Sequence, residues 1–270
     1  MDAPMFRNRY MAHALGALHG FGYLNNEEAF LASVRKWHRY FEVDLTLTED
    51  GHVMPAHGWT PENAERCGLE YKEDFGHMTR DLFLKQKVHG MPVMDIETLY
   101  GHMKKHPEFF WQLDLHTLDR ETAAKVTRAL INDLHNDRDL LDRLLIQANS
   151  SAMFEGIDSV YHFRYYQLFV RKNASHEKIS KAVDYCVKNG FVSLAVHTGD
   201  VDPEVVSLIH DAGLKILVYT VNKRKRADDL FVMGVDTICT DRLSPKDDLK
   251  EKIRKLPVIR TVISLRRRNK

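Results

Sequence analysis

The sequence is poor in cysteine. It has three, Cys67, Cys186 and Cys239, and no two of them have C-x-x-C spacing. An odd number of widely separated cysteines argues against a disulfide framework and against a zinc site. This cysteine usage favours a reducing compartment, and we expect a cytoplasmic protein.

The sequence also lacks long apolar runs and an excess of charge of either sign. No segment reaches the roughly 18 uninterrupted apolar residues of a membrane span, and the first dozen residues lack the apolar core of a signal peptide. The 39 Lys and Arg residues nearly balance the 38 Asp and Glu residues, for a net charge of +1. This balance gives no global attraction to nucleic acid. We therefore expect no nucleic-acid partner, while transient contact with a membrane surface and the oligomeric state stay open.

The second half of the chain shows a regular alternation of helix and strand. Gly190, Gly213 and Gly234 each end a stretch with helical periodicity and precede a β-rich run. The helical stretches cover residues 178–188, 203–211 and 224–233. Together with the first half, the predicted strands span residues 10–15, 41–47, 109–115, 143–148, 166–170, 191–197, 215–221 and 237–240.

Eight βα units in about 250 residues predict an α/β fold, a (β/α)8 TIM barrel with its active site at the carboxyl ends of the strands. A doubly wound sheet is the alternative, but no glycine-rich phosphate loop follows the first strand. We expect a single domain over residues 1–270. Residues 58–106 are too many for a simple crossover, so they are interpreted as an insertion after strand two that partly covers the site and ends in a helix over 96–105.

Two carboxylates stand on one face of the second predicted strand. Side chains alternate along a strand, so Glu42 and Asp44 share a side, and Asp114 lies on the polar side of the next strand. A solvent-exposed edge strand is one explanation. If the strands are buried, unpaired carboxylates are costly unless a metal binds them. Ligands that are all oxygen suit Mg or Ca.

Polar residues also gather at the ends of other predicted strands. His13, His57 and His116 each lie at or just after such an end, as do His197 and Asp241, for which structural hydrogen bonding is expected. Other histidines, His38, His102 and His106, are in polar or helical contexts and are expected at the surface. The basic end of the chain, residues 266–270, is interpreted as a mobile, solvated tail.

Several motifs occur in an order that is specific as a set. They are Ala12-His13, the Asn-Asn-Glu-Glu-Ala-Phe of residues 25–30, the Phe-Glu-Val-Asp of 41–44, the Thr-Glu-Asp-Gly of 48–51 with His57, and the segments 218–222 and 234–241. This set resembles the motifs of the glycerophosphodiester phosphodiesterase family, whose members are (β/α)8 barrels. The likeness covers nearly the whole chain.

The resemblance implies a site and a chemistry. His13 and His57 would be a general acid/base pair. Glu42, Asp44 and Asp114 would hold one divalent cation, Mg or Ca, that binds the phosphodiester. The substrate would be a small-molecule or lipid phosphodiester. The further substrate contacts that we expect are His116, Asn222 and Gln147.

The chain also departs from the family pattern. Ala14 stands where the family usually has Arg, and Gly58 replaces an acid after the second histidine. Asp114 is shorter than the usual Glu, and His116 replaces a Lys. Without the Arg, we expect the phosphate to be held mainly by the metal and by neutral donors.

Three functions agree with these residues. The leading one is a metal-dependent phosphodiesterase that cleaves a glycerophosphodiester or a phospholipid head-group phosphodiester by His/His general acid/base catalysis. The second is a phospholipase D-like lyase or transferase in which the substrate's own hydroxyl attacks to form a cyclic phosphate. The third is a noncatalytic binding barrel that has kept the pocket and lost the Arg and Lys contacts.

Overall fold

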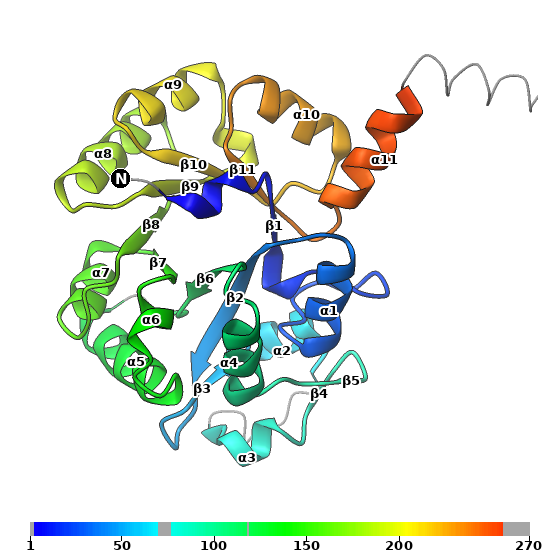
Figure 1. The fold of residues 1–270 in the computed structure, drawn as a ribbon. Helices are drawn as coiled ribbons and strands as arrows, with labels where there is room; N and C mark the ends of the chain where they lie inside the picture. Colours follow the sequence, from blue (N-terminus) through cyan, green and yellow to red (C-terminus); the bar gives the residue numbers. More distant parts are fainter. Residues whose placement is uncertain (1–2, 70–76, 118, 256–270) are drawn as a thin grey trace, which may run out of the picture.

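Eight parallel strands form a closed barrel in the computed structural model, which describes residues 3–69, 77–117 and 119–255 (Figure 1). The strands are β1 (Tyr10–Ala12), β2 (Tyr40–Leu47), β6 (Phe110–Asp114), β7 (Leu145–Ala148), β8 (Tyr165–Phe169), β9 (Ser193–His197), β10 (Lys215–Tyr219) and β11 (Thr237–Thr240). The first strand pairs with both β2 and β11, and these two pairings close the ring. The predicted TIM-barrel fold is confirmed.

Helices form the outer layer of the barrel (Figure 1). They are α1 (Glu27–Arg35), α4 (Ile96–Lys105), α5 (Arg120–Asp133), α6 (Arg138–Leu141), α7 (Ser151–Asp158), α8 (His176–Lys188), α9 (Pro203–Asp211), α10 (Arg224–Val232) and α11 (Pro245–Lys255). The four helices predicted from the sequence agree with α4, α8, α9 and α10 to within two residues at each end. Helices α1 and α4 to α10 lie in the connections between successive barrel strands, as a parallel barrel requires, and α11 follows the last strand.

Local sequence signals explain where these helices begin and end. The side chain of Asp95 accepts a hydrogen bond from the Thr98 N–H and caps α4, and Asp202 caps α9 in the same way. Gly190 and Gly213 follow α8 and α9 with φ angles of 72° and 76°, which glycine adopts without strain. The glycines that ended the predicted helices therefore end α8 and α9 in the structure.

The second strand divides its side chains between the barrel interior and the helical layer. Phe41 faces outward and packs on Trp111 of β6, with 5.1 Å between ring centroids. Glu42 and Asp44 are only 4% and 3% exposed and line the interior pocket. Parallel pairing places Asp44 beside Asp114 of β6 in register. The edge-strand explanation for these carboxylates is therefore wrong, because β2 has paired strands on both sides.

The chain between β2 and β6 forms the insertion. It contains β3 (Val53–Pro55), α2 (Pro61–Cys67), α3 (Arg80–Phe83), β4 (Lys87–Val88) and β5 (Met91–Pro92) before α4. Strand β3 pairs antiparallel with the end of β2 and was not predicted. Residues 70–76 of the insertion and the basic tail 266–270 lie outside the described residues.

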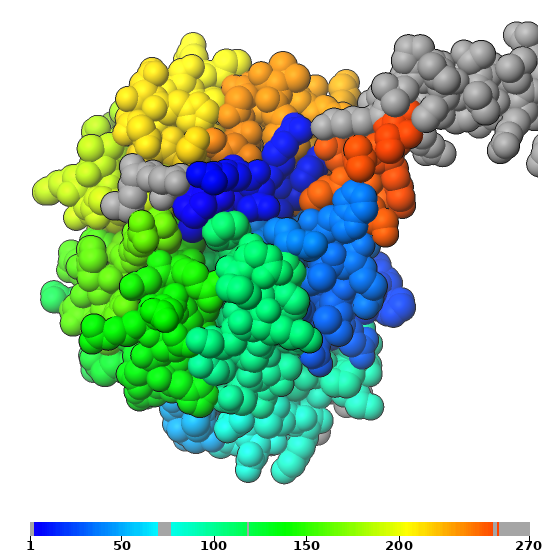
Figure 2. Space-filling view, viewed as in Figure 1, coloured from blue at the N-terminus to red at the C-terminus, as the bar shows by residue number. Residues whose placement is uncertain are grey.

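The amino-terminal segment closes one end of the barrel. The 3-10 helix η1 (Pro4–Arg7) carries Met5 and Phe6, which pack in one apolar cluster with Tyr40 and Leu145, the first residues of β2 and β7. Figure 2 shows this segment, in dark blue, lying across that face of the molecule. A pocket is therefore expected at the opposite end, where the strands finish.

The cysteines and one histidine lie in the core. The three cysteines are free and buried. The prediction of a surface position for His38 is wrong: the residue is 3% exposed and its ring lies 6.5 Å from that of Phe41. It stands two residues before β2, where the chain has already entered the core. In the part of the chain that the structure describes, no helix is long and apolar enough to cross a membrane.

Candidate functional site

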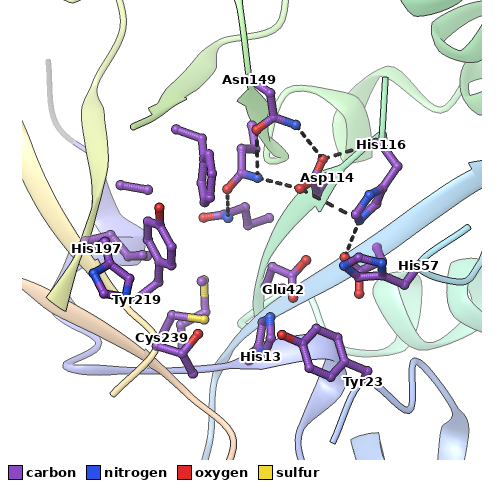
Figure 3. Close-up of a pocket in the computed structure, with 18 of the residues that line it drawn as sticks. His13, Tyr23, Glu42, His57, Asp114, His116, Asn149, His197, Tyr219 and Cys239 are labelled. Atoms are coloured by element: carbon purple, nitrogen blue, oxygen red, sulfur yellow. Dashed lines mark hydrogen bonds and ion pairs between the residues drawn. The ribbon is translucent and has the colours of Figure 1, made fainter. Parts of the chain in front are cut away.

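A cavity of about 570 Å³ lies at the carboxyl ends of the strands (Figure 3). All the predicted site residues except Asn222 line it: His13, Glu42, Asp44, His57, Asp114, His116 and Gln147. These residues come from β1, β2, β6, β7 and the loops that follow, which are neighbours in the ring. Folding thus brings together residues that are up to 134 positions apart in the sequence.

His13 begins the short 3-10 helix η2 (His13–Leu15) directly after β1. Its Nδ1 lies 2.7 Å from Oδ1 of Asp241, and the other oxygen of Asp241 accepts a hydrogen bond of 2.6 Å from the Asn222 amide. Burial opposes a charge on His13, but the hydrogen bond to Asp241 and the nearby Glu42 raise its pKa to about 9. Asn222 thus lies outside the pocket and fixes the carboxylate that holds His13.

His57 follows β3 and faces His13 across the ring of Tyr23. The Tyr23 centroid is 4.8 Å from that of His13 and 5.3 Å from that of His57. His57 Nδ1 lies 3.0 Å from Oδ1 of Asn63, an acceptor, so Nδ1 carries a proton. Burial lowers the pKa of His57. A neutral ring with a proton on Nδ1 leaves Nε2 as an acceptor.

Asp44, a carboxylate of the pocket, is held by two side chains, Asn25 and His116. Asn25 donates to its Oδ2 at 2.7 Å, and Nε2 of His116 lies 2.5 Å from its Oδ1. Burial opposes ionisation of Asp44, but the His116 partner holds its pKa well below the ordinary range. Burial lowers the pKa of His116, but the negative charges of Asp114 and Asp44 outweigh this effect and raise the pKa to about 10. The two residues form an ion pair.

Glu42 lies deeper on the same face of β2. Its Oε2 accepts a hydrogen bond of 2.6 Å from the backbone N–H of Ala14, while burial and the Asp44 charge raise its pKa to about 8. Ala14 itself is fully buried with φ 47° and ψ 44°. Its methyl group is not part of the pocket lining. An Arg at this position would therefore need a local rearrangement to reach the pocket.

Asp114 is held by amide side chains from the next strand and its loop. Gln147 donates to Oδ2 at 2.5 Å, and Asn149 donates to Oδ1 at 3.1 Å. The Gln147 carbonyl oxygen accepts from Gln112, whose own oxygen accepts from Gln167. Gln147, predicted as a substrate contact, thus lines the pocket with its amide already engaged in this buried network.

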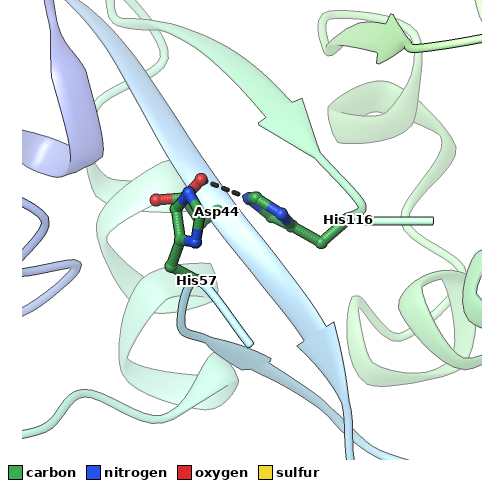
Figure 4. A group of neighbouring side chains, drawn as sticks. All are labelled: Asp44, His57 and His116. Atoms are coloured by element: carbon green, nitrogen blue, oxygen red, sulfur yellow. Dashed lines mark hydrogen bonds and ion pairs between the residues drawn. The ribbon is translucent and has the colours of Figure 1, made fainter. Parts of the chain in front are cut away.

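Three side chains of the pocket could hold a metal ion. Asp44, His57 and His116 each offer one ligand atom, and these atoms all lie within 4.8 Å of one another (Figure 4). Carboxylate and imidazole are both common ligands of divalent cations, so this donor set fits such an ion. The set shares Asp44 with the predicted carboxylate triad but contains two nitrogen ligands in place of Glu42 and Asp114.

Two residues of the site were missed by the sequence reasoning. Tyr23 separates the two histidines, and Arg66 of α2 extends to the same place. The Arg66 guanidinium lies 3.4 Å (Nη1) from Nε2 of His57 and 5.3 Å from the centre of the Tyr23 ring. No motif marks either residue, because both belong to loops or insertions whose paths the strand pattern does not predict.

The closed parallel barrel, with its pocket at the carboxyl ends of the strands, has the architecture of the TIM-barrel class of proteins. The family model for the glycerophosphoryl diester phosphodiesterase family matches residues 25–244. The chain belongs to this family of phosphoric diester hydrolases. No curated protein gives a significant match to the chain.

Solved structures show the same fold. An Oleispira antarctica phosphodiesterase, in complex with the product sn-glycerol-3-phosphate, is 15% identical with a TM-score of 0.76, and the match covers 93% of this chain and 100% of that one. A glycerophosphodiester phosphodiesterase from Agrobacterium tumefaciens is 19% identical with a TM-score of 0.66 over 87% and 95% of the two chains. One from Parabacteroides distasonis is 17% identical with a TM-score of 0.63 over 91% of each.

Proposed function

We propose that this protein is a metal-dependent phosphodiesterase that hydrolyses a glycerophosphodiester or a phospholipid head-group phosphodiester, with His13 and His57 as its acid and base. The observation that carries the proposal is the meeting of these two histidines, 44 residues apart in sequence, on either side of Tyr23 in one pocket. Carboxylates of β2 and β6 line the same pocket. The product bound to the Oleispira antarctica relative fits this substrate class.

His13 is the proposed general acid. Its Nδ1 donates to the Asp241 carboxylate, which favours the imidazolium form, and Nε2–H is then the proton that the leaving alkoxide receives as its bond to phosphorus breaks. Asp241 and Asn222 act through His13 by fixing its ring. In this role Asp241, a half-buried carboxylate, orients His13 as the third group of a catalytic triad orients its histidine.

His57 is the proposed general base. Its Nδ1–H donates to Asn63, so the lone pair of Nε2 accepts the proton of the oxygen that attacks phosphorus. In hydrolysis this oxygen belongs to water. In the lyase or transferase alternative it belongs to a hydroxyl of the substrate, and the same two histidines would act in the same order.

Glu42, Asp44 and Asp114 are the proposed ligands of one Mg or Ca ion. Asp44 and Asp114 are register partners on adjacent strands, and Glu42 lies two residues before Asp44 on the same face. Oxygen ligands suit these hard cations. When bound, the ion neutralises charge on the phosphoryl oxygens. His116 and Gln147 hold Asp44 and Asp114 by hydrogen bonds, and His116 is a proposed substrate contact.

The test is turnover of a panel of glycerophosphodiesters and lysophospholipids with Mg or Ca, followed by ³¹P NMR. We expect cleavage that EDTA abolishes and that the metal restores. Replacing His13 or His57 by Asn should lower kcat by roughly two to four decades each, and the double variant should lose less than the product of the single losses. A cyclic phosphate product would favour the lyase alternative. Near-normal turnover in both single variants would contradict the proposal.

A further inference from the structure

The pocket has a second half that the proposed chemistry does not use. The ring order β1, β2, β6, β7, β8, β9, β10, β11 places β8, β9 and β10 directly opposite β1, β2 and β6. In Figure 3, His197 and Tyr219 lie on one side of the pocket, and His57 and His116 on the other. The residues that line this second half are Phe169, Arg171, Ala195, His197, Leu217, Tyr219 and Thr220.

The two halves differ in charge. The carboxylates that line the pocket are Glu42, Asp44 and Asp114, and all three belong to β2 and β6. The half formed by β8, β9 and β10 has no carboxylate in its lining, but it has the guanidinium of Arg171, two residues after β8. Among the described residues, no hydrogen-bond or ion-pair partner of Arg171 is found. Its charge is available to a ligand.

His197 supplies a second donor to this half. The backbone N–H of Gly199 donates to His197 Nδ1 at 3.1 Å, so a neutral ring carries its proton on Nε2. Arg226 holds the following loop through hydrogen bonds to Thr198 and to the Val201 carbonyl oxygen. The end of β9 is therefore fixed in place, with a hydrogen-bond donor in the same half of the pocket lining as Arg171.

An apolar wall connects these donors. The rings of Phe169 and Tyr219 stack with 4.5 Å between centroids, and the Tyr219 hydroxyl donates to the Val170 carbonyl oxygen at 2.6 Å. This bond ties the end of β10 to the end of β8 and engages the Tyr219 hydroxyl. The wall is rigid and can contact the carbon atoms of a short alcohol.

We propose that the β8–β10 half is a subsite for the alcohol leg of the substrate and that this leg carries an anionic group. The inference rests on the proposed function, which places the phosphodiester at the β1–β2–β6 side. From there, one leg extends across the mouth to Arg171 and His197, which bind an anion by charge-assisted hydrogen bonds. The quaternary ammonium group of choline would contact aromatic rings in this half. The positive charge of Arg171 would repel it, so a choline leg is disfavoured.

Three noncleavable glycerophosphonate analogues that differ only in their alcohol test this subsite. The alcohol is glycolate, its neutral isostere glycolamide, or choline. Calorimetric titration with Mg present measures their binding, and the corresponding diesters measure kcat/KM. We expect the wild-type protein to bind the glycolate analogue about tenfold more tightly than the glycolamide analogue, as one charge-assisted contact at a partly exposed site would give. Choline should bind most weakly.

Arg171→Gln should remove the difference between glycolate and glycolamide. The adjacent, exposed Lys172 is not part of the pocket lining, so Lys172→Gln should leave the difference unchanged. Equal binding of the three analogues by the wild type, tightest binding of choline, or a preference that survives in Arg171→Gln would overturn the subsite. If the diesters are cleaved but the glycolate compound is not preferred over the glycolamide compound, the subsite alone is rejected. If the glycolate analogue binds more tightly but no diester is cleaved, the proposed function alone is rejected.

Discussion

His57 is the residue on which the interpretation of the site depends most. As the base, it must keep the lone pair of Nε2, and as a member of the group formed with Asp44 and His116 it would donate a nitrogen to a metal. A ring whose Nδ1 is engaged with Asn63 has one nitrogen left, so it cannot fill both roles at once. Metal binding and catalysis can therefore be separated at this position.

We predict that His57→Asn binds Mg or Ca with nearly wild-type affinity, because the proposed ligands are the carboxylates. Asp44→Asn should weaken binding by more than about a hundredfold, since it removes a charged ligand. Isothermal titration of the metal into each variant measures this, with His77→Asn, at an exposed histidine, as the control. Loss of binding in His57→Asn would instead assign the ion to the group of one carboxylate and two imidazoles.

Arg66 places a guanidinium cation next to the histidine pair. Its Nη1 lies 3.4 Å from His57 Nε2, at the mouth of the pocket, whereas Ala14 leaves no cation at the position after His13. We predict that Arg66→Gln lowers kcat/KM on order of tenfold, the usual loss of one charged hydrogen bond. Arg66→Lys should recover part of the lost kcat/KM. Lys85→Gln, in the same insertion and outside the pocket lining, is the control. Equal activity of Arg66→Gln and wild type would mean that metal and neutral donors suffice for the phosphate, as expected from the sequence.

At the scale of elements, the sequence predicted what strand periodicity and helix caps determine. The eight barrel strands and four helices were found because hydrophobic periodicity and residues such as Gly190 and Gly213 are local signals. The inward direction of Glu42 and Asp44 followed from the same alternation. Elements that depend on distant contacts were missed: β3, which exists by pairing with β2, and η1, which is placed by the strand ends that it covers.

The same limit applied to the site: strand positions predicted which residues line the pocket, but loop positions did not. Residues on strands or directly after them, such as Asp114 and His116, were placed correctly in the pocket. Asn222 was not, because its amide turns to Asp241 after strand β10 ends, and strand parity says nothing about a loop side chain. Arg66 and Tyr23 could not be found, since they reach the pocket from segments that follow no repeating pattern.

The packing of the amino-terminal element η1 should contribute to the stability of the barrel. Met5 is 1% exposed within the apolar cluster at the closed end of the barrel. Met5→Ala should lower the free energy of unfolding by about 2–5 kcal/mol, the usual cost of emptying a buried site. Its kcat should stay near wild type, because the pocket is at the other end. Urea unfolding followed by circular dichroism measures the change, with Val232→Ala, at an 89% exposed position, as a control expected to change little. A stability equal to wild type would show that η1 does not close the barrel in solution.

At the scale of the whole molecule, the barrel is held closed where its first and last strands meet, and His38 is buried at this seam. It precedes β2 and lies beside the backbone of Tyr10 in β1 and of Leu243 after β11. Its Nδ1 is buried without a hydrogen-bond partner among the described residues. Burial lowers the pKa of His38 from 6.5 to about 4, against the opposing effect of hydrogen bonding to the backbone of Tyr10 and Leu243.

This lowered pKa predicts how stability depends on pH. Between pH 6.5 and 4 the unfolded chain binds a proton at His38 that the folded chain does not, so the free energy of unfolding falls as the pH falls through this window. The full contribution is present above pH 6.5, and up to about 3 kcal/mol of it is lost near pH 4. His38→Gln cannot take up this proton, so its stability should decline less steeply over the same range. Urea unfolding at pH 7, 6, 5 and 4 gives both slopes, with His176→Gln at an exposed histidine as the matched control. If His38→Gln and wild type lose stability in parallel, His38 does not stay neutral at the seam, and the acid sensitivity of the barrel must come from its paired carboxylates.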